Sequence, residues 1–349
     1  MATAAGLLAA TGCASARGTA PDVRPVGEPL RARAEARGVM IGSAADAGLR
    51  LGGAAGDSFR TILGREFDEV TPENSMKHAR VHPARDVYTF GDADALVAFA
   101  RQRGMTVRGH TLVWHRQLAP WLTQGTWTRE QARALLEEHI DSVAGHFRGR
   151  IAAWDVVNEA VADDASMRRT FWSEAVGPDY IELAFRRAAA ADPGAKLFYN
   201  DYNIEGINPK SDSVYALLQR LLARGVPVHG VGLQAHFEVG TVPPTLAANI
   251  ARFAALGLEV HITELDVRVP QPSTAAQREQ QARDYAMIAG ACLAAPQCKA
   301  IVLWGFTDAL SWIPREFPGW GDAHPFDAQY RPKAAWAALR DAFEARTVP

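Results

Sequence analysis

Alternating strand and helix signals, repeated eight times after residue 39, constrain the fold of this 349-residue chain more than any other feature. Each strand signal is a short run of β-branched or apolar residues, and an amphipathic stretch follows it. Such uninterrupted apolar strands are typical of a parallel sheet that is buried on both faces. Eight strand–helix units are also the number that closes a (β/α)8 barrel. The predicted strands are Val39–Ala44, Glu66–Thr71, Met105–Thr111, Ile151–Asn158, Lys196–Asn200, Val228–Gln234, Leu258–Thr263 and Ala300–Gly305.

The clearest helix signal covers residues 128–147, where Thr128 is a predicted N-cap and Gln131 completes a capping box. Similar amphipathic stretches cover residues 92–103, 274–295 and 333–346. A doubly wound open sheet is the alternative fold, but no G-x-G-x-x-G follows the first strand, which disfavours a dinucleotide-binding domain. We therefore expect one α/β domain, a (β/α)8 TIM barrel, over residues 31–349.

Charge and composition exclude several classes of protein. Hydrophobic residues make up 48% of the chain and charged residues 22%, which is enough to build a large core and excludes a disordered or collagen-like chain. The 37 Lys and Arg nearly balance the 39 Asp and Glu, giving a net charge of −2. Nucleic acids and anionic membranes call for a basic excess, so neither is an expected partner. We expect a monomer.

The first sixteen residues are predicted to be an export signal rather than part of the fold, because residues 2–16 are small and apolar without a charge. Two cleavage patterns compete. Ala14-Ser15-Ala16 fits ordinary signal peptidase, whereas the stretch ending at Cys13 resembles a bacterial lipoprotein box that would place a lipid on that cysteine. We expect an exported protein that is secreted, periplasmic or lipid-anchored at the cell envelope. Residues 17–30, with three prolines, are predicted to be a linker.

Export makes the two remaining cysteines interpretable. Cys292 and Cys298 are separated by five residues, and an oxidising compartment favours a disulfide between them over two unrelated thiols.

Polar and aromatic residues follow seven successive predicted strands. In a (β/α)8 barrel the C-terminal strand ends and the following loops carry the chemistry, and packing alone does not explain such a set there. The residues at these strand ends are Glu73, Asn74, Lys77, His110, Trp114, His115, Asn158, Glu159, Asn200, Tyr202, Asn203, Gln234, His236, Glu264, Asp266, Trp304 and Trp312.

Two carboxylates narrow the chemistry. Glu159 and Glu264 follow strands four and seven, so they are expected to face each other across the mouth of the barrel. A facing carboxylate pair is what glycoside hydrolysis requires, since one group protonates the leaving oxygen while the other attacks or stabilises the sugar carbon. The indole rings of Trp114, Trp304 and Trp312 suit the apolar faces of sugar rings.

Seven segments closely resemble the family-10 glycoside hydrolases, which are retaining endo-β-1,4-xylanases. The resemblance covers roughly residues 30–346, with the motifs in the family's order. It implies hydrolysis of β-1,4-xylosidic linkages in xylan by double displacement with two glutamates, no cofactor, no metal, and xylan or xylo-oligosaccharides as ligands. It also implies the Cys292–Cys298 disulfide. The segments are TPENSMK (71–77), RGHTLVWH (108–115), WDVVNE (154–159), NDYNIE (200–205), GLQAHF (232–237), ITELD (262–266) and WGFTD (304–308).

The resemblance also implies a role for each residue. Glu159 corresponds to the acid/base and Glu264 to the nucleophile, with His236 bonded to Glu264 and oriented by Asp266. Asn158 would bond the 2-hydroxyl of the sugar at the cleavage point. The other expected sugar contacts are Lys77, His110 and Gln234 at that sugar, Glu73 and Asn74 at the next one, Trp114, Trp304 and Trp312 over the rings, and Tyr202 on the leaving-group side.

Two residues depart from the family pattern. His78 stands where the family usually has Trp, and Ala235 replaces a common Gly. We expect His78 to change a wall behind the site without abolishing activity.

Three alternative functions compete with this interpretation. A metal-dependent barrel hydrolase would use His110, His115, His236, His261 and Asp266, but no H-x-H follows the first strand and no H-E-x-x-H is present. A non-catalytic polysaccharide-binding protein would need the tryptophans but not the facing glutamates. A β-1,4-glucanase is the alternative within the same class of enzyme.

Overall fold

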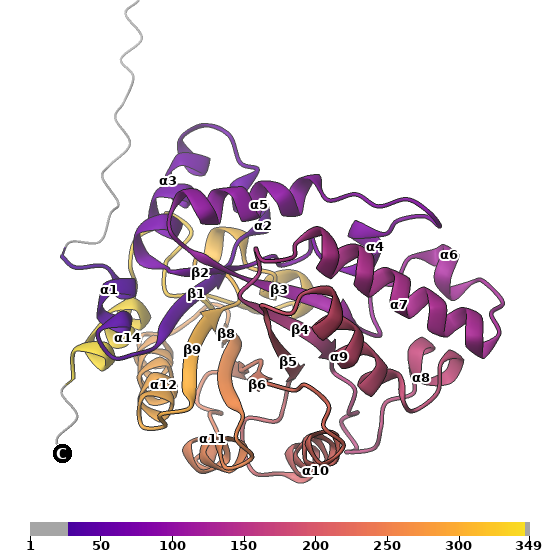
Figure 1. The fold of residues 1–349 in the computed structure, drawn as a ribbon. Helices are drawn as coiled ribbons and strands as arrows, with labels where there is room; N and C mark the ends of the chain where they lie inside the picture. Colours follow the sequence, from indigo (N-terminus) through magenta and orange to yellow (C-terminus); the bar gives the residue numbers. More distant parts are fainter. Residues whose placement is uncertain (1–26, 346–349) are drawn as a thin grey trace, which may run out of the picture.

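Eight parallel strands form a closed ring in the computed structural model, which describes residues 27–345 (Figure 1). Ring neighbours follow chain order, and the last strand pairs with the first, for example Ile301 with Ile41. Helices cover the outside of the ring, so the predicted (β/α)8 barrel is confirmed. The predicted export signal, with Cys13, and most of the predicted linker lie outside the described residues.

Of the ten strands within residues 27–345, eight form the ring. The other two pair with the second half of one ring strand. The ring strands are β1 (Met40–Ala44), β2 (Glu69–Thr71), β3 (Thr106–Val113), β4 (Ala153–Asn158), β5 (Lys196–Asp201), β6 (Gly230–Leu233), β8 (Glu259–Pro270) and β9 (Cys298–Leu303).

Nine longer helices lie outside the ring, and several shorter ones lie in the loops of the described chain. The longer ones are α3 (Gly53–Glu66), α5 (Gly91–Gln102), α7 (Arg129–His146), α9 (Tyr180–Ala191), α10 (Pro209–Ala223), α11 (Leu246–Ala254), α12 (Ala275–Leu293), α14 (Ala334–Glu344) and, at the start, α1 (Leu30–Glu35). The shorter ones are α2 (Asp46–Leu49), α4 (His78–Val81), α6 (Pro120–Thr123), α8 (Phe171–Ala175), η1 (Asp308–Leu310) and α13 (Ile313–Glu316).

Capping residues mark several of these helices as the sequence indicates. Thr128 accepts a hydrogen bond from the Gln131 amide, and the Gln131 side chain accepts one from the Thr128 amide, as a capping box requires. Thr274 forms the same box at the start of α12. These side chains satisfy amides that the first helical turn would otherwise leave unpaired.

Most predicted strand boundaries lie within two residues of those in the structure, and two differ by more. Strand β2 begins at Glu69 rather than Glu66, because α3 continues to Glu66 and buries its carboxylate against the Leu30 amide and the Trp336 indole. Strand β8 continues past the predicted end at Thr263, since β7 (His236–Glu238) and β10 (Trp320–Gly321) pair with its second half. Glu264 therefore lies within a strand that neighbours hold on both sides.

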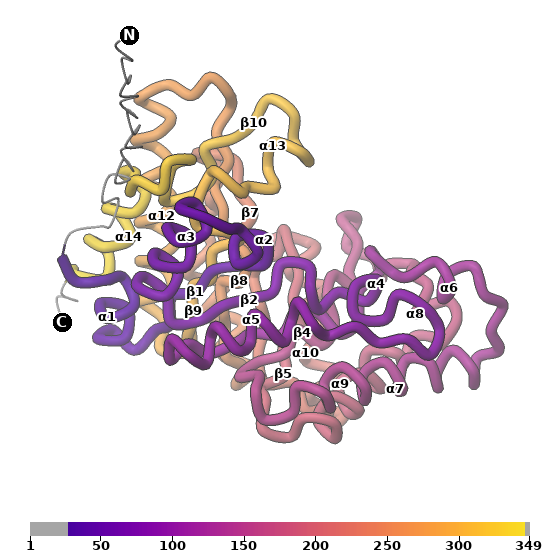
Figure 2. Tube along the Cα trace, turned by 90° about the horizontal axis from the view of Figure 1, so that it is seen from above, coloured from indigo at the N-terminus to yellow at the C-terminus, as the bar shows by residue number. Residues whose placement is uncertain are grey.

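The two ends of the described chain come together beside the ring. Helices α1 and α14 lie side by side next to β1 and β9 (Figures 1 and 2). The Arg37 guanidinium donates to the carbonyl of Phe343 at 3.2 Å, which links the end of α1 to the end of α14. This contact closes the helical layer where the barrel itself closes.

The predicted disulfide between Cys292 and Cys298 is confirmed, and both residues are buried. It joins the end of α12 to the first residue of β9. None of the helices within residues 27–345 is long and apolar enough to cross a membrane.

Removing this disulfide is expected to destabilise the fold modestly. Because the closed loop is short, the double substitution Cys292→Ala and Cys298→Ala should cost about 2 kcal/mol of unfolding free energy. Urea unfolding followed by circular dichroism measures the change. Reductant should lower the midpoint of the natural chain and leave that of the variant unchanged. Equal midpoints for the variant and the oxidised natural chain would contradict the expected contribution.

Candidate active site

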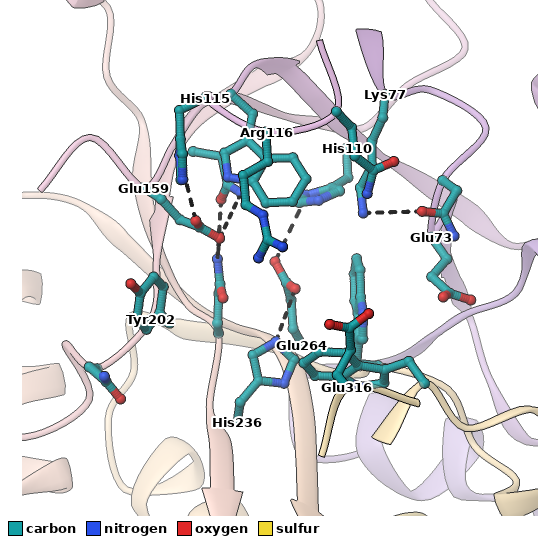
Figure 3. A pocket seen from close by; sticks show the side chains of 18 of the residues that line it. Glu73, Lys77, His110, His115, Arg116, Glu159, Tyr202, His236, Glu264 and Glu316 are labelled. Carbon is teal, nitrogen blue, oxygen red and sulfur yellow. Dashed lines mark hydrogen bonds and ion pairs between the residues drawn. The ribbon is translucent and has the colours of Figure 1, made fainter. Parts of the chain in front are cut away.

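A cleft of about 880 Å³ opens at the C-terminal ends of the ring strands. Fourteen of the residues at the strand ends have an expected role in catalysis or sugar binding. Thirteen of them line the cleft, and the other, Asp266, lies directly behind His236. Figure 3 shows their side chains converging from different strands and loops onto one space. The lining residues that the sequence predicts are Glu73, Asn74, Lys77, His110, Trp114, Asn158, Glu159, Tyr202, Gln234, His236, Glu264, Trp304 and Trp312.

Glu159 reaches the cleft because the chain turns sharply at the end of β4. Its φ is 60°, in the left-handed region that few residues other than glycine adopt. Successive side chains on a regular strand point to opposite faces, and this turn lets both Asn158 and Glu159 line the cleft. Strained backbone of this kind is characteristic of functional sites.

Glu264 is buried, 5% exposed, and its two carboxylate oxygens have different partners. Oε1 accepts a hydrogen bond from Asn200 Nδ2 at 2.7 Å, and Oε2 lies 3.2 Å from His236 Nε2. Burial by itself raises the pKa of Glu264, but the His110 imidazole and the hydrogen bond and charge of His236 outweigh it, so the pKa lies below its ordinary value. The carboxylate is therefore held in its ionised form.

Asp266 holds His236 in place from the other side. Its Oδ1 lies 3.1 Å from His236 Nδ1, and its Oδ2 accepts a hydrogen bond from the Trp312 indole at 2.7 Å. Burial opposes the positive charge of His236, but Asp266 and Glu264 on its two nitrogens prevail and raise its pKa to about 10. An imidazolium donates from both nitrogens, so it suits a place between two carboxylates.

Side-chain amides link the two glutamates. Asn158 Nδ2 and Gln234 Nε2 donate to Glu159 Oε1 at 3.2 and 3.0 Å, and Asn200 donates both to Asn158 Oδ1 at 2.9 Å and to Glu264. A side chain at position 232 would collide with this network, because a Cβ on Gly232 would lie 2.1 Å from Asn200 Oδ1. Glycine at that position leaves Asn200 the space to reach Glu264.

A buried ion pair supports His110 from beneath. Its Nδ1 lies 2.9 Å from Asp155 Oδ2, and the fully buried Arg108 pairs with the same carboxylate. His261 is buried behind the cleft with Nδ1 3.1 Å from Arg108 Nη1. Of the histidines considered above for a metal-dependent hydrolase, His261 is separated from the cleft, and His236 lies between two carboxylates.

The second motif forms another wall of the cleft. Asp46 accepts hydrogen bonds from the Ser75 amide at 2.6 Å and from the amide of Asn74, which fixes the loop after β2. Lys77 Nζ lies 4.9 Å above the Trp114 ring and 3.4 Å from Asn74 Oδ1. Burial lowers the pKa of Lys77, although the charges of Glu264 and Glu73 oppose this.

On the opposite side of the cleft, Tyr202 is fixed by charged neighbours. Its hydroxyl donates to Asp163 at 2.9 Å and accepts from Arg168 at 3.1 Å, while Lys210 Nζ lies 3.4 Å from the ring centre. His115 also faces this side, with Nδ1 3.8 Å from Glu159 Oε2 (Figure 3).

Several lining residues have no signal in the sequence that distinguishes them. All but Arg268, which lies in the second half of β8, lie in the segments after ring strands. Arginines and glutamates are common on the surface of any chain, so residue type alone does not identify them. These residues are Arg116, Gln117, Arg168, Arg268, Arg315, Glu316 and Phe317.

The chain is similar in sequence and in structure to several known proteins. The family described as glycosyl hydrolase family 10 matches residues 29–342. Endo-1,4-beta-xylanase B of Thermotoga neapolitana is 43% identical over 340 residues, covering 97% of this chain and 96% of that protein. Native xylanase 10B of Thermotoga maritima has a TM-score of 0.88 at 44% identity, covering 90% of this chain and 98% of the other. Xylanase 10B of Thermotoga petrophila in complex with xylobiose has a TM-score of 0.89 at 44% identity, covering 92% and 98%.

The substitution Asp266→Asn is expected to lower the pKa of His236 from about 10 towards its ordinary value near 6.5, because it removes the charge that faces Nδ1. The NMR resonances of the imidazole nitrogens measure this directly. Asp163→Asn, a matched change on the other side of the cleft, should leave the pKa of His236 unchanged. The prediction is wrong if His236 titrates identically in the natural chain and in Asp266→Asn.

His236 and Glu264 together make the stability of the fold depend on pH. Because folding raises the pKa of His236, its contribution is fully present below about pH 6.5 and is lost as the pH rises towards 10. Glu264 behaves oppositely: its pKa is lowered from 4.5, so its contribution is present above that pH and is lost on acidification.

Proposed function

The chain belongs to glycosyl hydrolase family 10, and from that premise we propose that this glycoside hydrolase cleaves internal β-1,4-xylosidic bonds of xylan with retention of configuration. The observation that carries the proposal is the pair Glu159 and Glu264 in one cleft, joined through amides and differing in their neighbours. Two similar proteins support xylan as the substrate. One is the endo-1,4-beta-xylanase B of Thermotoga neapolitana, and the other is the Thermotoga petrophila enzyme in complex with xylobiose.

In the first step, Glu264 acts as the nucleophile. A carboxylate oxygen attacks the anomeric carbon from the face opposite the leaving group, and an ester bond forms as the glycosidic C–O bond breaks. The electron pair of that bond goes to the leaving oxygen, which takes a proton from Glu159. His236 and Asn200 keep Glu264 ionised and aimed before the reaction begins.

In the second step, Glu159 acts as the base. It takes a proton from a water molecule whose oxygen attacks the anomeric carbon, and the ester bond breaks to return Glu264 to its carboxylate form. Two inversions leave the product with the β configuration of the substrate. Gln234 and Asn158, which donate to Glu159 Oε1, hold the carboxyl in place through both steps.

Sugar-binding residues surround the two glutamates. We assign Asn158 to the 2-hydroxyl of the sugar that is attacked, and Lys77, His110 and Gln234 to the same sugar. Glu73 and Asn74 take the next sugar towards the non-reducing end, Trp114, Trp304 and Trp312 pack over the rings, and Tyr202 faces the leaving group. All of these residues line the cleft.

Xylose is favoured over glucose by the rigidity of two indoles. Trp304 is 7% exposed, and the bond to Asp266 anchors Trp312. In this proposal the hydroxymethyl group of glucose would project against these rings, and overpacking of that kind costs roughly 1–3 kcal/mol.

The domain organisation and export form part of the same proposal. A signal over residues 1–16 would direct export, residues 17–30 would act as a linker, and residues 31–349 would form one catalytic domain. The family match over residues 29–342 supports a single catalytic domain over this part of the chain.

Xylan digestion tests the endo mode and the substrate together. Because the sugar-binding residues lie on both sides of the glutamates, we expect the viscosity of xylan to fall faster than reducing ends appear. Carboxymethylcellulose under the same conditions should react much more slowly. Release of xylose alone from the first minutes, or equal rates on the two polymers, would contradict the proposal.

Variants of the two glutamates should separate their roles. Glu264→Ala should abolish turnover of xylan, whereas Glu159→Ala should lose about 10²–10⁴-fold on xylan, whose leaving group needs a proton. A dinitrophenyl xylobioside needs no proton to depart, so with Glu159→Ala it should give a fast burst and then slow turnover.

Added azide identifies which face each variant leaves open. Glu159→Ala should accelerate its slow phase and yield the β-glycosyl azide, whereas Glu264→Ala should yield the α-azide from the same activated β-glycoside. NMR of the products distinguishes the two anomers. An α-azide from Glu159→Ala would reverse the two assignments.

A further inference from the structure

Three buried histidines meet outside the cleft, two from the ends of α4 and one from α7. His78 is the first residue of α4, His82 follows its last residue, and His139 lies on the inner face of α7. One ring nitrogen from each lies within 4.8 Å of the others. We call these three residues the histidine cluster.

The cluster lacks the hydrogen-bond partners that buried polar groups require. His82 and His139 are both 0% exposed, and within residues 27–345 none of their four ring nitrogens makes a hydrogen bond of ordinary length and angle. His78 Nδ1 accepts only a long bond from the Ala119 amide at 3.3 Å. Unpaired polar atoms in an interior are costly and rare, so four of them on two adjacent rings point to a ligand.

The chemistry of the three rings selects the kind of ligand. Imidazole nitrogen is a common protein ligand of transition-metal ions, and each of the three side chains offers one nitrogen close to the other two. Aromatic rings cover the cluster, with Trp121 4.6 Å and Tyr88 4.0 Å from the His82 ring.

We propose that His78, His82 and His139 bind one divalent transition-metal ion of the Zn²⁺ class. Imidazole nitrogen is a preferred ligand of such ions, and two histidines four residues apart are a common metal-binding spacing. Tetrahedral Zn²⁺ with bonds of about 2.0–2.1 Å places its ligand nitrogens about 3.4 Å apart, so small side-chain rotations must draw the three nitrogens together. A water molecule would complete the coordination.

A metal site at the histidine cluster is not expected from the sequence, because the candidate metal ligands there are histidines in or after the predicted strands. The H-x-x-x-H spacing at residues 78–82 is visible in the sequence, but its third ligand comes from a helix almost sixty residues later. His78 supplies one of the three imidazoles of the cluster.

The expected role of the ion is structural. The His78 ring centre lies 6.2 Å from that of Trp172, whose indole donates to the Trp114 carbonyl at 3.1 Å, so the cluster lies behind a wall of the cleft. The ion would fix α4 to α7 and thereby support this wall. The proposal does not depend on the proposed hydrolysis, and either can fail alone.

Zn²⁺ binding by the chelator-treated full chain is the test. Titration calorimetry should give one Zn²⁺ per chain, and the melting temperature should rise with Zn²⁺ concentration. His78→Trp fills the space with another aromatic ring and should weaken this binding at least about 100-fold, more than the loss of an outer-sphere partner does. His146→Gln is the matched control, since His146 pairs with Asp94 outside the cluster, and it should bind Zn²⁺ like the natural chain.

X-ray absorption at the zinc edge makes the test independent of any variant. The natural chain with one equivalent of Zn²⁺ should show three imidazole nitrogens at about 2.0–2.1 Å. Fewer than three imidazoles, no stoichiometric binding by the natural chain, or equal affinity in a folded His78→Trp would each overturn the proposal.

Discussion

The constraint on which the rest of the cleft depends is that Glu264 carries a negative charge while buried. Burial at this depth raises the pKa of a carboxyl group, so the group becomes neutral unless nearby charges and hydrogen-bond donors stabilise its ionised form. Here His236 and Asn200 contact the two oxygens, and His110 adds a third favourable group. The two histidines each depend on a further residue, since Asp266 supports His236 and Asp155 supports His110.

The closed ring of strands is what brings these groups together. Asn200, His236 and Glu264 come from β5, β7 and β8. Strand β6 pairs with both β5 and β8, and β7 pairs with β8, so parallel pairing brings together residues that are far apart in sequence. The extension of β8 beyond its ring pairing is important for the same reason. Pairing of Asp266 with His236 in register places the carboxylate beside the imidazole, so backbone hydrogen bonds fix a side-chain geometry. Rigid supports of this kind give a preorganised site.

The sequence predicts the barrel and most of the cleft because both have local signals. Alternating runs identify strands, and a polar residue at a strand end in a parallel sheet has few places to point other than the mouth. The ion pair of Arg108 and Asp155 could not be predicted in this way, because both residues lie within strands and meet only when β3 and β4 pair. Arg168 and Arg315 lie in loops whose course no periodicity predicts. Ala235 has a φ of 62°, in the left-handed region that favours glycine, but the sequence alone does not reveal a backbone angle.

The central claim of this account is that Glu264 forms the covalent bond to the sugar. A dinitrophenyl 2-fluoro-xylobioside reacts in the first step and hydrolyses slowly in the second, so the sugar remains attached to the protein. Peptide mass spectrometry of the inactivated chain should find one fluorinated disaccharide on Glu264, and xylobiose present during the reaction should slow its attachment. A label on Glu159, or inactivation without a label on either glutamate, would contradict the account.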